Sequence, residues 1–166
     1  MAKLHVKKIP QDYAERAVLV GVKRPNQQWP TESSLAELER LAQTAGAEVV
    51  ATTFQRLESP NPRTFIGSGK VDEVAQLCRS YAADLVIFDD ELTPSQQSNL
   101  EKQVGKDIKI IDRTALILDI FALHATSREG RLQVRLAQNE YLLPRLRGMW
   151  AHLASNRMGG GVGSRF

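Results

Sequence analysis

Short apolar runs alternate with helix-forming stretches between residues 17 and 112, and this alternation constrains the fold more than any other feature of the sequence. Parallel strands of one sheet need a crossover of a dozen or more residues, usually a helix. The sequence therefore predicts an α/β fold, with a small parallel four-stranded sheet flanked by helices. Residues 85–88 are all apolar, which favours a central strand. The other predicted strands are 17–22, 48–54 and 108–111, with a short extended piece at 64–66.

Polar residues in front of the periodic apolar stretches predict where the connecting helices begin. Ser33 or Ser34 is expected to cap the first helix, and Ser68 is expected to open the second. Thr93 followed by Pro94 predicts a cap and a first helical residue for the third helix.

No strand is predicted beyond residue 112, and residues 114–147 are expected to be helical. The first part of this stretch is apolar on most sides and is expected to pack on the sheet. The second part carries a narrow leucine seam of coiled-coil type, which needs a partner helix. Self-association is one way to cover that seam. Pro144 is expected to kink or end this helix. The seam residues are Leu132, Leu136, Asn139, Leu143 and Leu146.

Three parts are predicted for the chain, which are an extension (1–14), an α/β subdomain (15–127) and a helical arm (128–166), and charge sets the arm apart. The arm holds seven arginines, no lysine and two glutamates, so its net charge is 7 − 2 = +5. The remaining residues hold fifteen Lys/Arg and seventeen Asp/Glu, which gives 15 − 17 = −2. Arginine favours planar, bidentate contacts with phosphate. The arm is therefore a candidate nucleic-acid contact, and a solvated helix face is the alternative.

Near the end of the arm, cations, one tryptophan and amide or imidazole donors lie close together, which is the mixture that single-stranded or looped RNA requires. The glycine run that follows lets the backbone approach another surface closely. The predicted RNA-binding residues are Arg145, Arg147, Trp150, His152, Asn156, Arg157 and Arg165, and the loop glycines are Gly159, Gly160, Gly161 and Gly163.

An alternative function is that of an α/β domain that binds a small ligand or nucleotide. Its candidate phosphate site is Gly67, Ser68, Gly69 and Lys70, which follow the extended piece and open a helix. A complete phosphate loop needs a further glycine and a Ser or Thr, and Thr64 and Val71 occupy those positions. A glycine turn with a serine cap is the competing interpretation. The acids Asp89–Glu91 follow a strand at its carboxyl end, where ligands bind in open sheets, although such acids also pair with cations.

No apolar run approaches the roughly 18 residues that span a bilayer, and the first residues are too polar for a secretory signal. We therefore expect a cytoplasmic protein. The single cysteine, Cys78, has no disulfide partner within the chain and is expected to be a buried helix residue.

Four stretches closely resemble the N-terminal region of the HflX family of ribosome-associated GTPases. They are FIGSGKVDEV (65–74), VIFDDELTPSQQSNLE (86–101), the stretch from IIDRTALIL to RLRGMW (110–150) and GGGVGSR (159–165). The resemblance covers roughly residues 15–166. It implies an α/β subdomain, then a long helical hairpin whose first arm is the segment 128–166, then a GTP-binding domain.

The resemblance also implies binding to the large (50S) ribosomal subunit near the peptidyl-transferase centre. The hairpin tip would contact ribosomal RNA there, and the GTP-bound parent would split stalled or stress-inactivated ribosomes. The implied partners are that subunit with its RNA, the GTPase domain of the parent and the second hairpin helix.

The sequence departs from the complete family pattern because its 166 residues hold no complete phosphate loop, no DxxG and no NKxD. We therefore expect neither GTPase activity nor a catalytic residue in this fragment. No metal or cofactor is expected in it either, and GTP with Mg²⁺ is expected only for the full-length parent.

Overall fold

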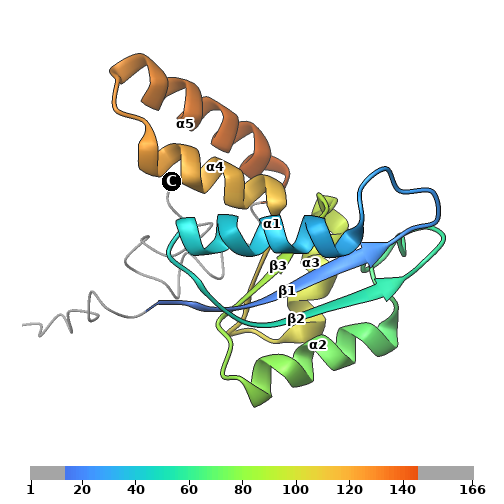
Figure 1. Cartoon of the computed structure of the whole chain (residues 1–166). Helices are drawn as coiled ribbons and strands as arrows, with labels where there is room; N and C mark the ends of the chain where they lie inside the picture. Colours follow the sequence, from blue (N-terminus) through green and yellow to red (C-terminus); the bar gives the residue numbers. More distant parts are fainter. Residues whose placement is uncertain (1–13, 146–166) are drawn as a thin grey trace, which may run out of the picture.

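The computed structural model describes residues 14–145, and a four-stranded parallel sheet forms its centre (Figure 1). The strand order is β2-β1-β3-β4, which confirms the predicted α/β fold and places the apolar strand β3 inside the sheet. The edge strand β2 is half-exposed and two residues longer than expected. The strands are β1 (Arg16–Lys23), β2 (Glu48–Arg56), β3 (Leu85–Phe88) and β4 (Lys109–Asp112).

Two apolar cores fill the space between the sheet and its helices, because successive strand residues point to opposite faces. On one face, Val18 and Phe88 pack against α2 and α3. On the other face, Leu19 and Ile87 pack against α1 and α4. Cys78 is buried in the first core, as predicted. The helices are α1 (Thr31–Thr44), α2 (Ser68–Ser80), α3 (Pro94–Val104), α4 (Arg113–His124) and α5 (Arg128–Leu142).

The predicted helix starts were correct for α3 and wrong for α1. Thr93 caps α3 in a capping box, since its hydroxyl accepts from the Gln96 amide at 3.1 Å and the Gln96 side chain accepts from the Thr93 amide at 2.9 Å. Helix α1 begins earlier, at Thr31, and Pro30 precedes it with no side-chain cap. The hydroxyl of Ser34 is engaged elsewhere, as a donor to Asp89.

The expected extended piece at 64–66 is instead a tight turn. Asn61 holds the turn, because its Oδ1 accepts from the amides of Arg63 and Thr64 at 2.8 and 3.3 Å. Phe65 adopts a φ of 65° and buries its ring edge-on against Phe88, with the ring centroids 6.2 Å apart. This buried contact stabilises a backbone conformation that is uncommon outside glycine.

Helices α4 and α5 form an antiparallel hairpin that projects from one side of the sheet (Figure 1). Helix α4 packs on the sheet as predicted, but only over its first half. Its first half is buried through Ala115 and Leu116, whereas Phe121 and Leu123 are 56% and 48% exposed. Helix α5 returns beside α4 and ends at Leu142, and a single 3-10 turn containing Pro144 follows, as the proline predicted. Between residues 14 and 145, no helix is long and apolar enough to cross a membrane.

Candidate functional site

The carboxyl edge of the sheet carries Asp89, which the sequence suggested as a ligand-binding acid. The guanidinium of Arg113 donates to its Oδ1 from Nε at 2.9 Å and from Nη2 at 2.6 Å. Ser34 donates its hydroxyl to Oδ2 at 2.5 Å. Arg113 also reaches Glu37 at 3.0 Å and the Ser34 carbonyl at 3.0 Å. Asp89 therefore joins α1, β3 and α4, and its oxygens are occupied.

The two following acids point to other cations. Asp90 lies 3.7 Å from Arg24, and burial raises its pKa although Arg24 opposes that shift. Glu91 is mostly exposed, with its carboxylate 3.9 Å from Arg145. The three acids therefore do not converge on one ligand. In the part of the chain from 14 to 145, no group of three His, Cys, Asp or Glu side chains is arranged to hold a metal ion.

The glycine-lysine segment Gly67–Lys70 lies at the start of α2, and its polar groups already have partners. The Lys70 ammonium contacts Glu73 at 2.6 Å and Thr53 at 3.0 Å. The Gly67 amide donates to the Gln55 side chain at 2.9 Å. This segment is a glycine turn at the start of a helix. The expected serine cap is absent, because Ser68 is the first helical residue and Gly67 is the N-cap. The geometry does not support a phosphate loop here.

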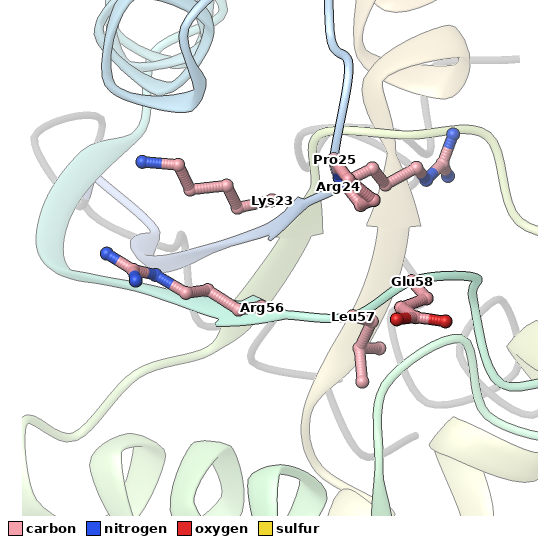
Figure 2. A pocket seen from close by; sticks show the side chains of 6 residues that line it. All are labelled: Lys23, Arg24, Pro25, Arg56, Leu57 and Glu58. Carbon is pink, nitrogen blue, oxygen red and sulfur yellow. The ribbon is translucent and has the colours of Figure 1, made fainter.

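A different hollow lies at the carboxyl ends of β1 and β2, and sequence reasoning did not find it. It has a volume of about 420 Å³. Figure 2 shows Lys23 and Arg56 extending to the same side, while Arg24 points away from them. Lys23 is 3.5 Å from Glu32. The available sequence signal was the presence of cations at the ends of two neighbouring strands. The lining residues are Lys23, Arg24, Pro25, Arg56, Leu57 and Glu58.

The leucine seam lies on the solvent side of α5. Leu132, Leu136 and Leu143 are 56%, 59% and 67% exposed, and Asn139 is exposed beside them. Helix α5 packs on the domain through other residues, including the buried Gln138, Tyr141 and Leu142. Within residues 14–145, the seam is therefore uncovered, as the sequence predicted. Leu146 lies outside the described residues.

Of the predicted RNA-binding residues, Arg145 alone lies in the described part of the chain. Its side chain is 8% exposed, and it donates to the Leu92 carbonyl at 2.6 Å and to the Tyr141 carbonyl at 2.9 Å. The guanidinium also lies 3.9 Å from the centre of the Tyr141 ring. This position does not support an RNA-facing role for Arg145 and makes it an anchor for the end of α5. The other candidates, Arg147, Trp150, His152, Asn156, Arg157 and Arg165 with the loop glycines, lie outside the described residues.

Two family models match the chain in succession. The N-terminal region of a GTP-binding GTPase matches residues 32–122, and the middle region of the same type of GTPase matches residues 124–166. Proteins called GTPase HflX from Flavobacterium psychrophilum and Escherichia coli are 49% identical to the chain over 152 residues and 40% identical over 154 residues. The chain belongs to the HflX family of GTPases. These matches cover 91% and 93% of the chain but only 36% and 35% of the relatives.

Solved structures of GTP-binding proteins share the fold of this chain. The complex of SsGBP with GDP is 26% identical, with a TM-score of 0.63 over 80% of the chain and 36% of that protein. A GTP-binding protein of Sulfolobus solfataricus in complex with GDP is 23% identical, with a TM-score of 0.60 over 87% of the chain and 42% of that protein, and shows the shared fold. The chain thus corresponds to the N-terminal region of the family, and it spans about a third of the length of its curated relatives.

Proposed function

We propose that this chain is the ribosome-binding region of an HflX-like GTPase and that it associates with ribosomal RNA of the large subunit near the peptidyl-transferase centre. The observation that carries the proposal is the charge of residues 128–166, which contain seven arginines, two glutamates and no lysine. Arginine without lysine suits phosphate recognition and base stacking. Family membership supports the same assignment. A cytoplasmic location is part of this proposal, because the proposed partner is the ribosome.

For the longer parent protein we propose GTP hydrolysis with Mg²⁺, used to split or rescue stalled or stress-inactivated ribosomes. The relatives are called GTPases, and the present chain matches about a third of their length. Its own 166 residues lack the guanine-nucleotide motifs, so we expect it to bind ribosomes without hydrolysing GTP.

The test uses the double variant Arg147→Ala, Arg157→Ala, which leaves the buried anchor Arg145 in place. We expect weaker co-sedimentation with large subunits, and a log–log salt dependence that is shallower by roughly 1.4 to 1.8, because each lost phosphate contact contributes about 0.7 to 0.9. The control is Lys102→Ala, Lys106→Ala, which removes two exposed cations from the α3 side of the domain. Equal affinities and slopes for wild type and the arginine variant would exclude the tip as the RNA contact.

A second candidate function is the binding of a small anionic ligand or nucleotide. The observation that favours it is the hollow with Lys23, Arg24 and Arg56 at the carboxyl edge of the sheet (Figure 2), which replaces the glycine-lysine segment as the best site for such a ligand. Calorimetry with ATP, GTP and inorganic phosphate tests it. Saturable binding that Lys23→Ala, Arg56→Ala abolishes and Lys70→Ala leaves intact would support this hollow, whereas the reverse pattern would support Gly67–Lys70.

We further propose that the leucine seam is covered by the second hairpin helix in the longer protein and by self-association in its absence. Light scattering of residues 1–166 over a range of concentrations tests the second part. A mass that rises with concentration, and stays that of a monomer when Leu132 and Leu136 are both replaced by Gln, would support it. A monomer at every concentration would contradict it.

A further inference from the structure

Three arginines form a stripe along one side of α5, away from the predicted tip. Arg128, Arg131 and Arg135 are exposed, and their spacing of three and four residues places them on one face of the helix. The stripe spans roughly 10 Å, from a rise of about 1.5 Å per residue. Among residues 14–145, none of these three side chains has a hydrogen bond or ion pair, unlike those of Arg113 and Arg145.

The position of this arginine stripe is electrostatically unfavourable for the isolated helix. Arg128 is the first residue of α5 and Arg131 lies in the next turn, so both face the positive end of the helix dipole. The acids of α5, Glu129 and Glu140, lie on the opposite flank of the leucine seam, at about 100° of rotation per residue. The stripe therefore concentrates positive charge that no acidic side chain among residues 14–145 pairs with, which suits an external anionic partner.

The surface next to the stripe is concave. A groove of about 360 Å³ runs between α4 and α5, with the three arginines along it and small or apolar residues between them. No acidic side chain lines this groove. Its remaining lining residues are Ala122, Ala125, Leu132, Val134 and Gln138. The hairpin that carries the groove stands out from the sheet (Figure 1).

We propose that the arginine stripe and its groove form a second RNA contact, which binds the phosphate backbone of an RNA helix without reading its sequence. Planar guanidinium groups pair with phosphate oxygens, and the groove offers few donors or acceptors that could read base edges. Helical RNA is recognised largely through phosphates and 2′-hydroxyls, which suits a row of arginines. The inference rests on the proposed binding to the large subunit and adds a contact along the hairpin to the one at the tip.

The test uses the chain of residues 1–166 and replaces the three arginines of the stripe by glutamine (Arg128→Gln, Arg131→Gln, Arg135→Gln). Glutamine is a good helix former without a charge. Binding is measured by sedimentation with intact large subunits and with protein-free large-subunit RNA, from about 50 to about 200 mM salt. The log–log slope should become shallower by roughly 2.1 to 2.7 with both, so that the loss of affinity over this fourfold salt range shrinks roughly 20- to 40-fold. The control Glu129→Gln, Glu140→Gln changes the opposite flank and should not make the slope shallower.

The outcomes separate this inference from the proposed function. If wild type binds and the stripe variant keeps its slope with both partners, the stripe is not a contact, while the tip can still be one. A shallower slope with intact subunits but an unchanged slope with protein-free RNA would identify an acidic ribosomal protein as the partner and overturn the RNA assignment. If wild type itself does not bind large subunits, the proposed function fails first. Circular dichroism checks that the variant retains its helices.

Discussion

The side chain of Asp112 holds two separate segments of the fold in place. It is the last residue of β4 and is fully buried. Its Oδ1 accepts from the Ala115 amide at 2.9 Å and so caps α4. Its Oδ2 accepts from the Leu92 amide at 2.9 Å and so fixes the connection between β3 and α3. Burial and the negative charge of Asp112 raise the pKa of Tyr141 well above its usual range, which keeps that phenol neutral.

Replacing Asp112 with alanine should lower the free energy of unfolding by about 2 to 4 kcal/mol. The change removes a helix cap and leaves a buried amide without an acceptor. Asp112→Asn should cost less, because one side-chain oxygen remains. Urea unfolding followed by circular dichroism measures both, and Asp107→Ala, at an exposed turn, is the matched control. A loss below about 0.5 kcal/mol for the alanine variant would contradict these roles.

At the residue scale, the sequence predicted what depends on neighbours along the chain. Thr93 was identifiable as a cap because its partner Gln96 is three residues away. The start of α1 was missed because Ser34 bonds to Asp89, 55 residues further along the chain. The hydrogen bond from Arg145 to the Leu92 carbonyl could not be predicted, because the two residues are 53 positions apart and nothing local signals their contact.

Helix α5 has two apolar surfaces, and only one of them is buried against the rest of the domain. Tyr141 and Leu142 are buried against the domain, whereas the leucine seam faces solvent. The spacing of the leucines predicted a seam without a partner, because a coiled-coil pattern needs a second helix. The extent of burial of α4 could not be predicted in the same way. Apolar residues occur on all sides of α4. The position of α5 determines which of these residues are buried.

Matched leucine substitutions on the hairpin should show this division. Leu116→Ala, in α4, should lower the free energy of unfolding by about 2 to 5 kcal/mol because that side chain is fully buried. Leu136→Ala, in α5, should change it by less than about 0.5 kcal/mol because that side chain is 59% exposed. Urea unfolding at a dilute protein concentration, where self-association is minimal, compares them. Similar losses for both variants would mean that the seam is covered.

At the scale of the whole molecule, Arg113 connects elements that are far apart in the sequence. Its guanidinium contacts Glu37 on α1, Asp89 after β3 and the Ser34 carbonyl. A lysine in its place could not reach all three groups at once, because an ammonium lacks the planar fork. We therefore expect Arg113→Lys to lower the free energy of unfolding by about 1 to 3 kcal/mol.

Chemical denaturation measures this effect, and Arg79→Lys, at an exposed position of α2, provides the control. The control should remain within about 0.5 kcal/mol of wild type. If Arg113→Lys were equally neutral, the contacts around Asp89 would not hold α1 and α4 to the sheet.

The fold was largely predictable from the sequence, whereas the candidate site was not. The alternation of strands and helices specifies a parallel sheet, and the packing of Val18 and Leu19 on opposite faces follows from strand geometry. The hollow lined by Lys23 and Arg56 depends on β1 and β2 ending side by side, with their last residues paired. That neighbourhood exists only after the sheet has formed.

Arg145 ties the end of the helical hairpin to the middle of the sheet. Its guanidinium donates to the Leu92 carbonyl at 2.6 Å, in the connection that leaves the inner strand β3. The amide of the same Leu92 donates to Asp112, the last residue of β4. One residue of a connecting loop therefore links the end of the hairpin, an inner strand and an edge strand of the sheet.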